Sequence, residues 1–190
     1  VCGRVLLLDR ALADALDRKG ETSQIAGLAF RRGGEVVLTP RRQRIRNIDE
    51  IPRPRWDLTP LPTYLEKGYS FGVNRGRTIP MLATRGCPYQ CTFCSSPQMW
   101  TTRWMARSPE LVVAEIKDYI RDYQVDNVDF YDLTAVVRRD WIVAFCKLLI
   151  KENLGITWQL PSGTRSEVID REVAEFLYRL LGDEVGRRDS

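Results

Sequence analysis

The sequence of 190 residues contains no histidine. Histidine is the commonest general base in enzymes and a frequent metal ligand, so its absence removes both roles from this chain. Ser-His-Asp hydrolysis, Cys-His proteolysis and catalysis by histidine-bound zinc are therefore excluded within the chain. Long apolar runs are also lacking: a short run such as residues 5–8 is far below the ~18 residues of a membrane span, so no span is expected.

The first ten residues carry a short apolar run, but Asp9 follows it at once and no small-residue cleavage site appears. A secretory signal peptide is therefore not expected, and the expected location is the cytoplasm. The first residue is Val instead of Met, which fits either a fragment or a start codon translated literally. With 44% hydrophobic and 28% charged residues, the composition is that of a soluble globular domain with a real core.

Positive charge is concentrated in one stretch. Residues 31–55 hold eight arginines and three acidic residues, whereas the whole chain has a net charge of +4. Clustered arginines can bind the phosphates of a nucleic acid. No aromatic residues are interleaved with these arginines, so the pattern favours a solvated connector whose arginines pair with nearby carboxylates. Nucleic acid is not the favoured partner.

The first half of the chain predicts small elements and a linker. Residues 9–19 have apolar positions at helical spacing, and Gly20 provides a stop. Residues 25–30 and 36–39 flank an Arg-Arg-Gly-Gly segment and predict a β-hairpin. From Pro40 to Pro80 the chain carries six prolines and few periodic segments, which predicts a wrapping linker without core residues.

The second half predicts three strand-helix pairs. Strands are expected over residues 79–84, 127–131 and 156–160, and helices over 109–123, 138–151 and 170–181, the last ending at Gly182. Such a succession predicts an α/β fold with parallel strands, a partial (β/α) TIM-like barrel of about three units. Three units do not close a barrel, and the third strand would keep an open edge, so a truncated protein is expected.

Three of the five cysteines, Cys87, Cys91 and Cys94, lie within eight residues on the loop after the first of these strands. This crowding favours metal ligation over a disulfide framework. Thiolates are the ligands of iron–sulfur clusters, and three of them leave one iron open. A closed zinc site needs four ligands, which makes zinc the weaker alternative. Cys2 is distant in sequence, and Cys146 falls in an apolar helical pattern, where a small buried hydrophobe is expected.

The spacing CxxxCxxC, with Phe93 directly before the last cysteine, resembles the radical S-adenosylmethionine (SAM) enzymes. The resemblance implies that Cys87, Cys91 and Cys94 bind a [4Fe-4S] cluster and that SAM chelates the fourth iron. Reduction by a partner such as flavodoxin or ferredoxin then cleaves SAM to a 5′-deoxyadenosyl radical. Phe93 is expected near the adenine, or else as a hydrophobe that anchors the loop.

Residues 27–31, 38–42 and 48–58 resemble the connector before the radical domain in the cobalamin-dependent branch, which includes methylases and the anaerobic magnesium-protoporphyrin ester cyclase. The resemblance implies a small-molecule substrate and three parts. Residues 1–50 would be the end of a cobalamin-binding domain with a hairpin connector, 51–78 a linker, and 79–190 a truncated radical SAM core. Without histidine, the lower cobalt ligand cannot come from this chain. Cobalamin contacts would belong to missing parts.

The ends of the second and third strands are expected to face the ligand. Asp132 and Thr134 occupy the place where the family holds the amino group of SAM, although the family's glycine-rich form is replaced here. Asp132 could equally cap the turn before the next helix. Arg165 is expected to pair with a ligand carboxylate, or alternatively with Glu167. Trp158 is expected in the core. Arg103 and Trp104 could guard the cluster, although the favoured interpretation is that they lie on a surface loop.

These observations give one leading function and two alternatives. The leading hypothesis is an oxygen-sensitive radical SAM enzyme of the cobalamin-linked branch. A methylthiotransferase-like enzyme acting on RNA is the second, motivated by the arginines of residues 31–55. A non-catalytic remnant that only binds an iron–sulfur cluster is the third.

Overall fold

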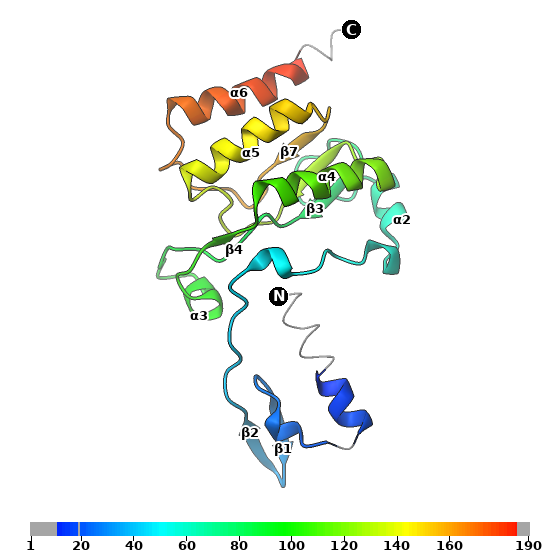
Figure 1. Cartoon of the computed structure of the whole chain (residues 1–190), viewed down its shortest axis with the longest axis vertical. Helices are drawn as coiled ribbons and strands as arrows, with labels where there is room; N and C mark the ends of the chain where they lie inside the picture. The colour runs from blue at the N-terminus through cyan, green and yellow to red at the C-terminus, as the bar shows by residue number, and fades with distance from the viewer. Residues whose placement is uncertain (1–10, 19, 186–190) are drawn as a thin grey trace. The chain divides into compact units, whose positions relative to one another are not determined.

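The structure of the chain, a computed structural model, describes residues 11–18 and 20–185, with side chains described up to residue 180. It divides into two compact units, Val1–Arg53 and Pro54–Ser190. Figure 1 follows the elements of both units along the chain. The predicted N-terminal helix is confirmed over residues 11–17. The predicted positions 9, 10 and 19 lie outside the described residues, as does Cys2.

The first unit contains the predicted β-hairpin. Strands β1 (Ala29–Arg32) and β2 (Glu35–Leu38) are antiparallel, and Arg32 pairs with Glu35 across the turn. Gly33 and Gly34 both have positive φ, 60° and 88°, which the tight turn of a two-residue hairpin requires. The 3₁₀ turns η1 (Thr22–Gln24) and η2 (Ile48–Glu50) flank the hairpin in sequence.

Arginines of the basic stretch pair with carboxylates. Arg32 lies 3.5 Å from Glu21 and Arg55 lies 2.6 Å from Asp57, each pair within its own unit. These side chains are exposed, so the pairs contribute little to stability. They fit the interpretation of residues 31–55 as a solvated connector.

The second unit begins with segments that sequence reasoning placed in a linker. The 3₁₀ turn η3 (Trp56–Leu58) precedes the short helix α2 (Leu61–Glu66). Leu61 and Leu65 are 4% and 2% exposed and belong to the hydrophobic core. The prediction that residues 40–80 lack core positions is therefore wrong here, because one turn of helix is enough to bury two leucines on the same face.

A parallel sheet lies at the centre of the second unit. Its strands β3 (Thr78–Met81), β6 (Asn127–Phe130) and β7 (Thr157–Gln159) occur in the order β3-β6-β7. Helices α4 (Pro109–Tyr123), α5 (Arg139–Glu152) and α6 (Arg171–Val185) follow one another along one side of the unit, with α5 between the other two (Figure 1). The three predicted strand-helix pairs are confirmed, with bounds shifted by up to four residues.

The two faces of the sheet differ in chemistry. Along β6, Val128 and Phe130 belong to the hydrophobic core. Successive side chains of a strand alternate between faces, so Asn127 and Asp129 belong to the other face. There Asp129 accepts hydrogen bonds from Asn127 at 2.8 Å and from Gln159 at 2.7 Å. The main-chain amides of Gly72 and Val73 also donate to this face, to Asp129 at 3.1 Å and to Gln159 at 3.3 Å.

Three features differ from the predictions. Helix α6 continues past Gly182 to Val185, so Gly182 does not end it. Within the described part of the chain the parallel sheet has three strands with β3 and β7 at its edges, and no barrel is formed. The predicted strand 79–84 is divided in two, because Thr84 belongs to β4 (Thr84–Arg85), which pairs with β5 (Met105–Ala106) in a separate antiparallel ladder.

Candidate functional site

The three clustered cysteines lie on one loop, closed at its base by the β4–β5 ladder. This cysteine loop comprises residues 86–104 and includes the short helix α3 (Ser96–Trp100). Gly86 opens the loop with φ +86°, and a Cβ at this position would lie 2.1 Å from the carbonyl oxygen of Arg103. The two ends of the loop therefore approach so closely that only glycine fits.

The thiols of the loop are free and differ in exposure. Cys87 and Cys91 are half-buried, and Cys94 is exposed. The Cys94 amide donates to the Cys91 carbonyl at 3.0 Å, which makes a turn between them. Thiols bind a metal as thiolates and must be accessible to it. All three cysteines of the loop are free and at least partly accessible, so they are chemically suited to hold iron.

Two donors from the chain point at these sulfur atoms. The Ser96 amide at the start of α3 donates to Sγ of Cys94 at 3.4 Å, and Nη2 of Arg165 donates to Sγ of Cys91 at 3.7 Å. Hydrogen bonds to sulfur ligands are one way in which a protein tunes an iron–sulfur cluster. The hydroxyl of Ser96 is itself buried and has no hydrogen-bond partner.

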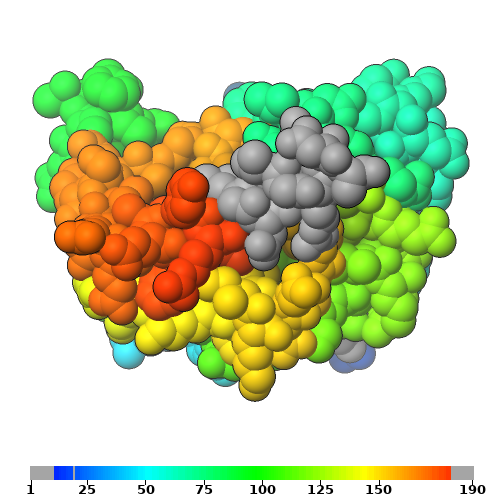
Figure 2. Space-filling model, turned by 90° about the horizontal axis from the view of Figure 1, so that it is seen from above, coloured from blue at the N-terminus to red at the C-terminus, as the bar shows by residue number. Residues whose placement is uncertain are grey.

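Arg165 belongs to the connection between β7 and α6, 74 residues from Cys91. Its guanidinium lies 4.2 Å from the centroid of the Tyr89 ring, and it lies 3.6 Å from the Glu167 carboxylate. Green residues of the cysteine loop border orange residues of this connection in Figure 2, in agreement with these contacts. The structure therefore brings Arg165 to the cysteines and includes the alternative pair with Glu167, whereas contact with a ligand carboxylate stays a prediction.

Asp132 and Thr134, just after β6, contact the base of the cysteine loop. The Asp132 carboxylate accepts hydrogen bonds from the Ala83 amide at 3.3 Å and from the amide and hydroxyl of Thr84. The Thr134 carbonyl accepts from Nε1 of Trp104 at 2.9 Å. Trp104 lies on the loop, as predicted, but its side chain is half-buried and packs against the core, while Arg103 is exposed.

The environment of Asp132 changes its acid–base behaviour. Burial raises the pKa of its carboxyl to about 6, although the hydrogen bonds from Thr84 and Ala83 partly oppose this shift. The side chains of Asp132 and Thr134 are 1% and 5% exposed. Since both Asp132 oxygens already accept hydrogen bonds from the chain, their predicted contact with the ammonium group of SAM stays a prediction.

Three further residues discussed from the sequence differ in how exposed they are. Phe93 is 92% exposed, so the alternative in which it anchors the loop is wrong, and its ring is accessible to a ligand. Cys146 is 1% exposed on α5, and burial raises the pKa of its thiol to about 12, as expected for an unreactive core cysteine. Trp158 packs against the core, as predicted.

An iron–sulfur cluster fits the donors by their chemistry, because three free thiols and two hydrogen-bond donors to sulfur occur on or beside one loop. In residues 11–18 and 20–185, however, no three His, Cys, Asp or Glu side chains are gathered closely enough to hold a metal ion. Binding would therefore have to draw the three cysteines of the loop together, a coupling of metal binding to folding that is common for such sites.

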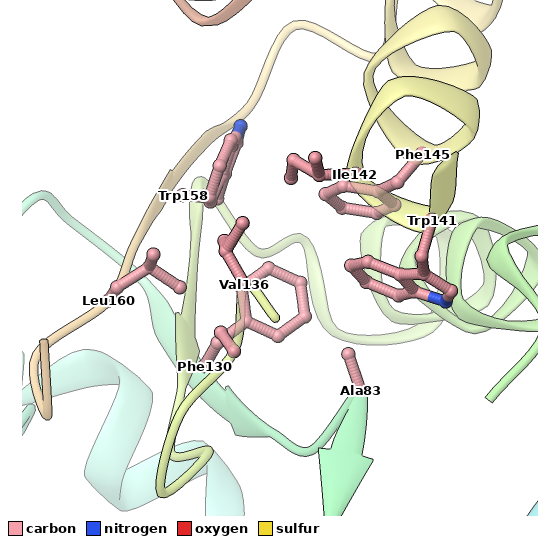
Figure 3. Close-up of a pocket in the computed structure, with 9 residues that line it drawn as sticks. Ala83, Phe130, Val136, Trp141, Ile142, Phe145, Trp158 and Leu160 are labelled. Carbon is pink, nitrogen blue, oxygen red and sulfur yellow. The ribbon is translucent and has the colours of Figure 1, made fainter. Parts of the chain in front are cut away.

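An apolar cavity of about 10 Å³ lies between the sheet and α5. Figure 3 shows aromatic rings around it, and the lining residues include Ala83, Phe130, Trp141, Phe145 and Trp158. This volume is close to the minimum that holds one water molecule, and the lining offers no polar partners. The cavity is a small gap in the packing of the core and cannot hold a substrate.

In the described part of the chain, no helix is both long and apolar enough to cross a membrane.

Comparison with known proteins identifies relatives of both sequence and fold. The profile of the radical SAM superfamily matches residues 81–183. An uncharacterised methyltransferase of Pyrococcus horikoshii is 33% identical over 175 residues, which are 92% of this chain and 36% of that protein. The anaerobic magnesium-protoporphyrin IX monomethyl ester cyclase of Cereibacter sphaeroides is 30% identical over 183 residues, 95% of this chain and 29% of the cyclase. The chain thus spans about a third of these relatives.

Solved structures share the fold at low sequence identity. The cobalamin-dependent S-adenosylmethionine radical enzyme OxsB superposes with a TM-score of 0.65 at 18% identity, over 90% of this chain and 25% of OxsB. The radical S-adenosylmethionine methyltransferase TsrM of Kitasatospora setae has a TM-score of 0.59 at 16% identity, over 92% of this chain and 34% of TsrM. Both comparisons support a common fold for nearly the whole chain.

Proposed function

Because this chain belongs to the radical SAM superfamily, whose profile matches residues 81–183, we propose that its cysteine loop holds a [4Fe-4S] cluster through Cys87, Cys91 and Cys94. The observation that carries the proposal is the loop itself, which presents three free thiols and is closed at its base by the β4–β5 ladder. Three thiolate ligands leave one iron of the cluster without a protein ligand. That iron is the proposed site of SAM.

Held by Cys87, Cys91 and Cys94, a reduced [4Fe-4S] cluster would supply the one electron that cleaves a carbon–sulfur bond of SAM, giving methionine and a 5′-deoxyadenosyl radical. The chain's own residues bind and orient SAM. Arg165, adjacent to Cys91 and 45% exposed, is suited to pair with the SAM carboxylate. The exposed ring of Phe93 is suited to pack on the adenine. Asp132 and Thr134 are proposed for the ammonium group, which requires one of their buried oxygens to become accessible.

The whole protein is proposed to carry out a cobalamin-dependent reaction of the methylase or cyclase type on a small molecule in the cytoplasm. Support comes from the relatives, which include a methyltransferase and an ester cyclase. In this proposal residues 1–50 end a cobalamin-binding domain and 79–190 are part of a radical SAM barrel. Residues 51–78 join the two parts and, through Leu61 and Leu65 of α2, also pack in the core of the second unit. A reductant such as flavodoxin or ferredoxin delivers the electron, and cobalamin contacts come from parts outside this chain.

The test is reductive cleavage of SAM. The chain is reconstituted anaerobically with iron and sulfide, reduced with dithionite and incubated with SAM, and 5′-deoxyadenosine and methionine are quantified by mass spectrometry. We expect the two products in equal amounts from the wild type. Cys91→Ala should abolish them, and Cys146→Ala should not, because Cys146 is buried on α5. A cluster-loaded wild type that forms neither product would overturn the proposed cleavage.

A further inference from the structure

We infer that Asp132 is a positioning residue that, together with the Thr134 carbonyl, fixes both ends of the cysteine loop and so determines how firmly the loop retains its cluster. This inference rests on the proposed function, because it needs Cys87, Cys91 and Cys94 as ligands. This positioning role of Asp132 is separate from its proposed contact with SAM.

Asp132 holds the entry to the loop. One carboxylate oxygen accepts from the Ala83 amide at 3.3 Å, and the other accepts from both the amide and the hydroxyl of Thr84. Cys87 follows Thr84 by only three residues. The entry strand β4 is thus tied to a residue 48 positions away, beyond the end of β6.

The main chain beside Asp132 holds the exit. The Thr134 carbonyl accepts from Nε1 of Trp104 at 2.9 Å, and the Thr84 hydroxyl lies 3.3 Å from the same oxygen. Thr84 also pairs with Ala106 in the β4–β5 ladder. Residues 132–134 therefore contact both the strand that leads into the cysteine loop, at Thr84, and the last residue of the loop, Trp104.

A carboxylate is the side chain that this position requires. Three donors converge on it, and a carboxylate offers acceptors on both oxygens, whereas an amide would turn its NH₂ group toward one of the donors. Burying a charge is costly, and the three hydrogen bonds to this carboxylate, which is 1% exposed, offset part of that cost. In contrast, the loop beyond this base has little packing of its own at Cys94 and Phe93, which are exposed.

The experiment compares cluster retention in matched variants of the full chain. Wild type, Asp132→Asn and Asp129→Asn are reconstituted, and iron loss to an excess of chelator is followed under anaerobic conditions. Asp129 is the control because it is also a buried carboxylate near the end of β6, yet its partners are Gly72, Asn127 and Gln159 rather than the cysteine loop. We expect Asp132→Asn to lose iron about tenfold faster than the wild type, because an amide leaves at least one of the three donors without an acceptor. Asp129→Asn should match the wild type.

Trp104→Phe provides a second variant in case Asp132→Asn folds poorly. It keeps an aromatic ring but removes the bond to Thr134, and we expect iron loss roughly threefold faster, in line with one neutral hydrogen bond. Rates of iron loss are compared at one temperature, at which circular dichroism shows the wild type and all variants to be equally folded. A general loss of stability would then not produce the difference. If the wild type loads a cluster and both variants retain it equally well, the inference is wrong. If the wild type loads none, the proposed function fails and this inference fails with it.

Discussion

The guanidinium of Arg165 lies 4.2 Å from the centroid of the Tyr89 ring, so a cation of the β7–α6 connection covers an aromatic side chain of the cysteine loop. The same guanidinium donates to Sγ of Cys91 at 3.7 Å. Two parts of the chain that are far apart in sequence thus meet at a proposed cluster ligand. The contact places a permanent positive charge beside a sulfur that would carry negative charge when it binds iron.

Arg165→Gln is expected to make the reduction potential of the cluster more negative. A positive charge and a hydrogen bond beside a thiolate stabilise the reduced, more negative cluster, and their loss should shift the potential on the order of 50 mV, close to a tenfold change in a one-electron equilibrium. Potentiometric titration followed by electron paramagnetic resonance measures the shift. Arg165→Lys should shift it less, because the charge remains. Arg138→Gln, on the exposed Arg138–Asp140 pair, is the control. Equal potentials in Arg165→Gln and wild type would contradict this role.

The raised pKa of Asp132 predicts a pH-dependent stability. Its carboxyl has a pKa of about 6 in the folded chain and an ordinary value of 3.8 otherwise. Between these values the unfolded chain releases the proton while the folded chain keeps it, so the free energy of unfolding falls as pH rises. The total decrease approaches about 3 kcal/mol above pH 6 and is absent below pH 4.

Urea unfolding of the metal-free chain between pH 4.5 and 7.5 measures this effect, with Asp132→Asn as the reference. The difference in unfolding free energy between the two proteins should shift in favour of Asp132→Asn as pH rises from 4.5 to about 6, and it should level off above that pH. A difference that does not depend on pH would show that Asp132 titrates normally.

Gly86→Ala is expected to destabilise the base of the cysteine loop. The residue has φ +86°, and a Cβ would meet the Arg103 carbonyl oxygen at 2.1 Å. Adopting this conformation alone costs an alanine about 1–2 kcal/mol, and the close contact adds to that cost. Gly163→Ala separates the two effects, because Gly163 has φ +78° with nothing within 4 Å of its Cβ position. Thermal unfolding should find Gly86→Ala clearly less stable than Gly163→Ala, and equal stabilities would argue against the tight approach.

The cysteines of the loop and Cys146 should differ in how fast their thiols are alkylated. In the metal-free chain, iodoacetamide should alkylate Cys87, Cys91 and Cys94 at least about a hundredfold faster than Cys146, whose burial raises the pKa of the thiol to about 12. Peptide mass spectrometry measures labelling at each position. After reconstitution the three loop cysteines should become protected. Rapid labelling of Cys146 in the folded chain would contradict its position in the core.

The sequence predicts the strand-helix framework because local signals and tertiary packing agree there. Ser108 and Pro109 mark the start of α4, and apolar residues at helical spacing predict α5 on the core side of the sheet. The hairpin follows from two glycines that reach positive φ. Each of these signals lies within a few residues of the element that it specifies.

The other features of the fold and the site depend on contacts between residues far apart in sequence, which no local pattern predicts. Leu61 and Leu65 enter the core from a proline-rich stretch. A helix of six residues is too short to show a recognisable periodic pattern of apolar residues. Strands β4 and β5 have two residues each and form because the ends of the cysteine loop meet. The partners of Asp132 lie 48 and 49 positions away, so the sequence suggested a ligand contact or a cap and missed the hydrogen bonds from Ala83 and Thr84.

The central claim is that Cys87, Cys91 and Cys94 hold a cluster with one iron open to SAM. The most direct measurement is electron paramagnetic resonance of the anaerobically reconstituted and reduced chain, with and without SAM, beside a variant in which all three cysteines are alanine. The account predicts a [4Fe-4S]⁺ signal that changes when SAM is added and is absent from the triple variant. A signal that ignores SAM, or that persists without the three cysteines, would contradict it.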